Sequence, residues 1–212
     1  MTFDKEFKEA ISRLTSAEKD KLIFRLLKKD LNLAKKLQFE LLSGDSKLED
    51  RRKQAKEQIQ SLVNFSREHG RFASPGMLML DMRNTSGIIK EHVKTTKDKY
   101  GEIYLHIFVL KEYLKIYTDY FKDSPKESTY TLNSYCIAKV FKIMILLRKM
   151  PKDLLFDFKD DIEEAVRLFS NNQNLMRLAI FNGLDIHWLT RNEIPDNIAE
   201  IEDEICRRGY LM

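Results

Sequence analysis

The stretch YTLNSYCIAKVFKIMILLRKM, residues 130–150, is apolar on nearly every side of the helix that it would form. Only a thin polar strip interrupts it, at Asn133, Lys139 and Lys142. A helix that is apolar nearly all round is buried on most of its sides. We therefore expect this segment to be the central helix of the fold, ended by Pro151.

The segment before it, residues 97–121, predicts a second long helix beside the first. Its apolar and aromatic residues recur with the helical period over the whole segment: Tyr100, Ile103, Tyr104, Ile107, Leu110, Leu114, Tyr117 and Phe121. The link between the two helices is short, around Asp123-Ser124-Pro125, so we expect them to pack antiparallel.

The rest of the chain supports an all-α fold. Only 7 Gly and 4 Pro occur in 212 residues, whereas a sheet-rich fold of this size needs many turns. We find no repeat with a 30–45-residue period of a known type. The fold class expected is an irregular multi-helix bundle, or a short HEAT-like helical stack, of about nine to ten helices.

We expect a single all-helical domain over residues 1–212, in three parts. Residues 1–44 should form a compact three-helix N-terminal unit, with a capping box at Thr15–Glu18 and a buried face of Leu22, Ile23, Leu26 and Leu27. Residues 45–150 should supply the long helices of the core, and residues 151–212 a set of acidic C-terminal helices. Whether residues 84–87, Asn-Thr-Ser-Gly, form a kink or a loop stays open.

Charge is distributed unevenly along the chain, whose net charge is +4. Residues 1–160 contain 32 basic and 23 acidic residues, whereas residues 161–212 contain 5 basic and 10 acidic ones. A basic body and an acidic tail can pair within one molecule or head-to-tail between molecules.

The cysteines and the hydropathy of the chain indicate its cellular compartment. The first residues, MTFDKE, contain no apolar segment of the signal-peptide type. Cys136 and Cys206 have no metal-binding spacing, and we expect both to be inert thiols, although Arg207 and Arg208 could lower the pKa of Cys206. The apolar stretch Ile137–Leu147 is too short to span a bilayer. We expect a cytoplasmic protein with no membrane partner.

No motif for chemistry emerges. The phosphate-binding glycine patterns and the GxSxG elbow are both absent, so we expect no cofactor and assign no catalytic residue. Asp98, Glu102 and His106 recur at i, i+4 and i+8 on one helix face and are the candidate metal ligands. One row on one helix does not supply ligands converging from several elements, so an ordinary solvated helix face is the preferred interpretation.

The run Arg51-Arg52-Lys53-Gln54-Ala55-Lys56 is the candidate site for an anion or a nucleic acid. Clustered Lys and Arg neutralise phosphates, but acids at positions 49, 50 and 57 dilute this run. The leading hypothesis is a non-enzymatic protein-interaction or scaffold domain that binds a protein partner or itself. The alternatives are a non-specific nucleic-acid-binding protein, and a metal-dependent enzyme with ligands from distant helices.

Overall fold

The structure is a computed structural model, and it describes residues 4–42, 45–70 and 72–209 of the chain. Within these ranges it contains eleven α-helices, one 3-10 helix and no strand, which confirms the all-α multi-helix architecture. The helices are α1 (Lys5–Ser12), α2 (Ser16–Lys29), α3 (Leu31–Leu42), α4 (Asp45–Glu68), α5 (Pro75–Thr96), α6 (Lys99–Phe121), α7 (Lys126–Arg148), η1 (Lys152–Phe158), α8 (Lys159–Ser170), α9 (Gln173–Phe181), α10 (Trp188–Arg191) and α11 (Ile198–Arg207).

Side-chain caps fix where several of these helices begin. The capping box of α2 is present, with Thr15 and Glu18 bonding to each other's backbone N–H. Asp30 Oδ1 accepts from Leu33 N at 3.0 Å at the start of α3. The segment 84–87 is helical and lies inside α5, so it is not a loop.

The core is centred on two helices rather than one. α7 has twelve buried residues, as its apolar sequence predicts, and α6 also has twelve. Tyr113 and Tyr117 of α6 are each 1% exposed, so the regular stripe seen in the sequence understates how completely this helix is enclosed. α6 packs against α4, α5, α7 and α8, and α7 packs against α5, α6, α9 and α11.

By length and composition alone, α7 is also long and apolar enough to cross a membrane. However, 61% of the most apolar 18-residue stretch of this helix is buried inside the protein. Core helices pass the same test, so this composition is weak evidence for a membrane span.

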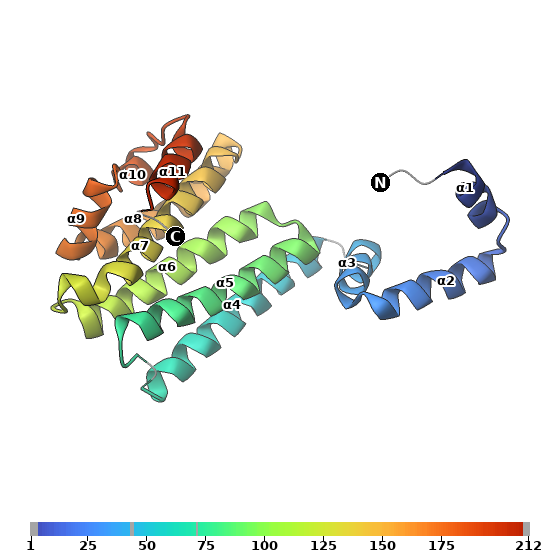
Figure 1. The fold of residues 1–212 in the computed structure, drawn as a ribbon, viewed down its shortest axis with the longest axis horizontal. Coiled ribbons are helices and arrows are strands. Elements are labelled where there is room, and N and C mark those ends of the chain that lie inside the picture. Colours follow the sequence, from blue (N-terminus) through green and yellow to red (C-terminus); the bar gives the residue numbers. More distant parts are fainter. Residues whose placement is uncertain (1–3, 43–44, 71, 210–212) are drawn as a thin grey trace.

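The helices of the body form successive layers (Figure 1). The long helices α4, α5 and α6 run side by side, and α7 packs across α5 and α6. The shorter helices α8 to α11 cover the other side of α6 and α7, at the far end of the body from the N-terminal helices (Figure 1).

The N-terminal unit is not compact, which corrects our expectation. α3 packs on α5, but α1 and α2 extend away from the body as an arm (Figure 1). None of the residues of α1, α2 or α3 is buried. Of the expected buried face, Leu22 and Leu27 are only partly buried and Ile23 and Leu26 are exposed, because an apolar stripe is buried only where another element covers it.

We expect the amides of α1 and α2 to exchange with solvent at least about a hundredfold faster than those of α6. Helices of 8 and 14 residues are marginal in water without tertiary packing, whereas the α6 amides open only with the core. Hydrogen exchange of the dilute protein, followed by mass spectrometry of its peptides, measures this difference. Equal protection of α2 and α6 would contradict it.

Candidate functional site

The most unusual surface of the molecule is the apolar face of the N-terminal helices. Nine large apolar side chains of α1 to α3 are exposed: Phe7, Ile11, Ile23, Phe24, Leu26, Leu31, Leu33, Leu41 and Leu42. Single exposed apolar residues are ordinary, but nine on three consecutive helices exceed ordinary scatter. The arm, α1 and α2, and the outer side of α3 therefore carry apolar area that the body of the same molecule does not cover.

Phe24 is the most exposed aromatic residue of the arm, with 63% of its surface accessible. Lys21 and Lys28 lie three residues before it and four after it, so they flank the ring on one face of α2, and Arg25 is the next residue along the chain. All three are exposed, and none forms an ion pair with a residue that the structure describes. α2 thus presents an aromatic ring among three available cations.

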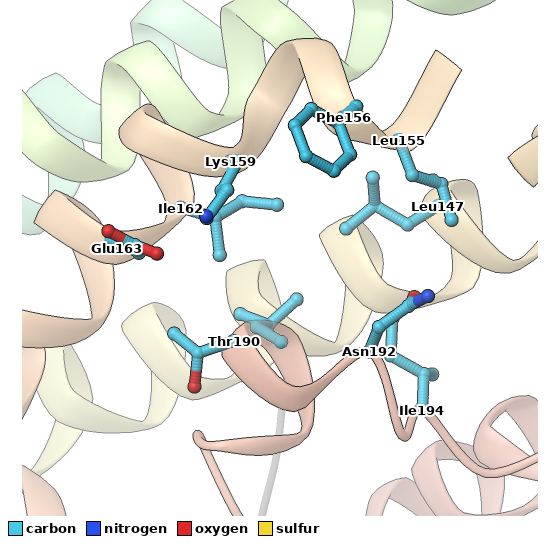
Figure 2. A pocket seen from close by; sticks show the side chains of 10 residues that line it. Leu147, Leu155, Phe156, Lys159, Ile162, Glu163, Thr190, Asn192 and Ile194 are labelled. Carbon is cyan, nitrogen blue, oxygen red and sulfur yellow. The ribbon is translucent and has the colours of Figure 1, made fainter. Parts of the chain in front are cut away.

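A hollow of about 240 Å³ opens between η1, α8 and the segment around α10 (Figure 2). It is lined by Leu147, Leu155, Phe156, Lys159, Ile162, Glu163, Leu189, Thr190, Asn192 and Ile194. Leu147, Leu155 and Ile162 form part of its apolar wall, and the Phe156 ring stands at its rim (Figure 2). Phe156 is 79% exposed, so a large aromatic surface borders the opening.

The helices that frame this hollow are acidic. From α8 to α11, residues 159–207, the chain has 5 basic and 11 acidic residues. Some of these acids are already paired: Asp161 and Glu164 contact Lys111, and Asp196 contacts Arg148. Glu163 and Glu193 are exposed, and their carboxylates pair with no described side chain. Lys159 of the lining and Arg191 next to it are exposed as well, so the excess of negative charge belongs to these helices as a whole rather than to the lining of the hollow.

The candidate metal ligands do not converge. Asp98 accepts hydrogen bonds from Arg52 Nε at 2.9 Å and from Gly101 N at 2.8 Å. Glu102 lies 3.5 Å from Lys142 Nζ, and His106 is buried on α6. No group of three metal-ligating side chains occurs among residues 4–42, 45–70 and 72–209. The row on α6 is divided among separate contacts.

Asp98 is instead the acceptor of a buried polar cluster. Its carboxylate also lies 3.2 Å from His92 Nε2 and caps the first turn of α6. Burial alone would raise the pKa of Asp98, but the hydrogen bonds from His92, Arg52 and Gly101 outweigh it and lower the pKa to about 2. The cluster joins α4, α5 and α6 at one end of the body.

The basic run on α4 is largely engaged with its own chain. Arg52 makes the two-pronged contact with Asp98, and the Arg51 guanidinium lies 5.3 Å from the centroid of the Phe39 ring. Lys56 donates to the Tyr104 hydroxyl at 2.6 Å. Lys53 is exposed. Three of the four cations thus hold α4 against its neighbours.

A second buried cation lies on α7. Lys139, which is 6% exposed, donates to Ser86 Oγ at 2.6 Å, and Ser86 Oγ is 3.1 Å from the Tyr135 hydroxyl. Burial lowers the pKa of Lys139 to about 8, with Cys136 opposing the shift and Lys142 adding to it. A serine beside such a lysine resembles a nucleophile with its base. Ser86, however, is inside α5, where the helix occupies the backbone N–H groups that would stabilise an oxyanion.

The cysteines give one correction. Cys136 is buried, and burial raises the pKa of its thiol to about 12, with Lys139 opposing the shift. The pKa of Cys206 is raised, by burial and by Glu202 and Asp203, rather than lowered by the neighbouring arginines. The acids of α11 face this sulfur, whereas residues adjacent in sequence point to other sides of a helix. Neither thiol is activated.

The exposed arm and the hollow were both missed in the sequence. The hollow is assembled from three separate segments, residues 147, 155–163 and 189–194, which no local pattern links. The helical spacing of Lys21 and Lys28 around Phe24 could be recognised in the sequence. Only the structure shows that the Phe24 side chain is exposed. No family model, curated protein or solved structure matches the chain, so the arm and the hollow are interpreted from their own geometry.

Proposed function

We propose that this protein is a non-enzymatic interaction domain whose N-terminal arm docks on another folded polypeptide. One observation carries the proposal: α1 and α2, the arm, expose five large apolar side chains and bury none of their residues, and α3 exposes four more. Leaving that area in water is unfavourable by about 25 cal/mol per Å² of apolar surface. A partner that covers the arm recovers this free energy.

The contacts of the body support a structural rather than a chemical role. The candidate metal residues pair separately, and Ser86 lacks an oxyanion site. The nucleic-acid alternative has little support, because Arg51, Arg52 and Lys56 contact groups of their own chain. We take a cytoplasmic protein as part of the same proposal.

A photoreactive phenylalanine analogue at position 24 tests the proposal in cells that express the chain. We expect a discrete cross-linked adduct, because the ring of Phe24 would be buried in the interface. The same analogue at position 29, on the opposite side of α2, is the matched control and should give little adduct.

The substitution Ile23→Asp adds a second criterion. Ile23 borders Phe24 on the exposed side of the arm, so a buried charge there should abolish the adduct from position 24. Equal adducts from positions 24 and 29, or an adduct insensitive to Ile23→Asp, would show random collision and overturn the proposal.

A further inference from the structure

We infer that the polypeptide that receives the arm is a second copy of this chain. α2 of one molecule docks on the acidic C-terminal helices of the next, with Phe24 in the hollow bordered by Phe156. This inference rests on the proposed function and names its partner.

Charge is the first argument. α2 carries five basic and two acidic residues, whereas residues 159–207 carry 5 basic and 11 acidic ones. Opposite charge on two surfaces steers them together and fixes how they meet. Lys21 and Lys28 flank Phe24, and Glu163, whose carboxylate pairs with no described side chain, lines the hollow. Lys159, the basic residue of its lining, is drawn toward the Phe156 ring, with its Nζ 5.6 Å from the ring centroid.

The size of the hollow is the second argument. Its volume of about 240 Å³ is below the roughly 300–1,000 Å³ of sites that enclose small-molecule ligands. A single side chain needs less room, and interface anchors are typically aromatic residues in an apolar pocket. Leu147, Ile162 and Leu189 supply apolar contacts for such a ring.

The positions of the two surfaces decide how the copies are arranged. The arm extends from one end of the body, and α8 to α11 lie at the other end, so one molecule's arm is remote from its own hollow (Figure 1). The contact is therefore head-to-tail. Such a contact uses two different surfaces, and each new molecule offers a fresh arm and a fresh hollow.

A groove on α4 and α5 is the alternative binding site for the arm. It is lined by Gln54, Glu57, Gln58, Ser61, Leu62, Phe65 and Ile88. Glu57 is the charged residue of its lining, but α4 as a whole carries six basic and five acidic residues, so it lacks the acidic excess of residues 159–207. Electrostatic complementarity thus favours the acidic helices over this groove.

Two substitutions at exposed residues test the two surfaces of the contact separately, the arm and the hollow. Phe24→Asp removes the anchor, and Thr190→Arg fills the mouth of the hollow and repels the cations of α2. Each should weaken association about thirtyfold or more, as loss of an interface anchor does. Circular dichroism of each variant checks that its helix content equals that of the original chain.

Sedimentation velocity over a concentration series gives the decisive measurement. We expect the original chain to form dimers and larger species, and each variant alone to stay monomeric. An equimolar mixture of the two variants should form a 1:1 dimer and nothing larger, because one intact arm and one intact hollow remain. Raising the salt from 0.1 M to 1 M, which shortens the screening length from about 10 Å to about 3 Å, should weaken that dimer.

A charge exchange tests the pairing itself. Lys28→Glu and Glu163→Lys should each weaken association, and their combination should restore it. Lys29→Glu changes the net charge equally on the opposite side of α2 and should have a smaller effect.

Several results would overturn the inference. They are a chain that stays monomeric at all concentrations, a mixture that stays monomeric, and a Thr190→Arg variant that assembles like the original chain. If the chain stays monomeric but position 24 still cross-links to a different polypeptide, the proposed function stands and the second copy is wrong. If position 24 gives no specific adduct, both fail.

Discussion

Replacing Asp98 by Ala is expected to lower the free energy of unfolding by about 3–5 kcal/mol, as breaking a buried ion pair does. The substitution removes the acceptor of Arg52 Nε and Nη2 and leaves His92 Nε2 without its acidic partner. The side chain of His92 is 3% exposed, so water cannot take the place of the missing carboxylate. The N-cap of α6, worth about 1 kcal/mol, is removed as well. Urea unfolding followed by circular dichroism measures the change.

Because of the same cluster, we expect the free energy of unfolding to decrease at acid pH. The pKa of Asp98 is lowered from 3.8 to about 2 in the folded protein, so its contribution is complete above pH 4. It is lost as the pH falls from about 4 to 2, because the unfolded chain binds the proton more tightly. This amounts to about 2 kcal/mol from Asp98. The Asp98→Ala variant should therefore lose less stability than the original chain over that interval.

Gly101 provides an independent perturbation of the cluster. A Cβ atom built at Gly101 lies 2.1 Å from Asp98 Oδ2 and 3.0 Å from Arg52 Nε, so Gly101→Ala must displace the carboxylate. Gly87 is the matched control, since it also lies within a helix and nothing lies within 4 Å of its Cβ position. We expect Gly101→Ala to destabilise and Gly87→Ala to stabilise by about 0.5–1 kcal/mol. Equal effects would contradict the role given to the Asp98 cluster.

The elements that depend on local signals were predictable. Thr15 and Glu18 specify their capping box within four residues, and the apolar circumference of residues 130–150 specifies a buried helix. Both are properties of consecutive residues, which the chain displays whatever its tertiary structure.

Contacts between distant segments were not predictable in the same way. Asp98 and Arg52 are 46 residues apart, and no pattern in either segment indicates that the two side chains pair. The helical period placed Asp98, Glu102 and His106 on one face, but the partners of Asp98 and Glu102 lie on α4, α5 and α7. The spacing of Asp98 and Gly101 was a usable signal for an N-cap with a close backbone approach.

The arm shows a different limit. Hydrophobic periodicity identifies which face of α2 is apolar, but it does not say which molecule covers that face. The expected compact unit assumed that the three helices cover one another. The structure leaves Phe24 and Leu26 exposed, and it is this departure from the expectation that supports an interaction role.

Replacing Lys139 by Met is expected to stabilise the protein by about 2 kcal/mol at pH 7. The pKa of Lys139 falls from 10.5 to about 8 on folding, which corresponds to about 3 kcal/mol of unfavourable burial of the charged form. Against this, the substitution removes the hydrogen bond to Ser86 Oγ, which is worth about 1 kcal/mol. Met has a similar unbranched shape, and Ser86 keeps its bonds to Met82 O and to the Tyr135 hydroxyl.

The pH dependence distinguishes this cause from a change in packing. Because the folded pKa is below the unfolded one, the unfolded chain binds more protons between pH 8 and pH 10.5, and the original protein gains stability as the pH rises through that interval. The advantage of Lys139→Met should therefore vanish near about pH 9.5, and at about pH 10.5 the variant should be less stable than the original protein by the roughly 1 kcal/mol of the lost hydrogen bond. Lys126→Met removes an exposed lysine of the same helix for which no described acid forms an ion pair, so it is the control and should change stability by about 0.5 kcal/mol or less at either pH. If Lys139→Met destabilised the protein at pH 7, Lys139 would be a net stabilising contact between α7 and α5, and its buried charge would not be the cost that the geometry indicates.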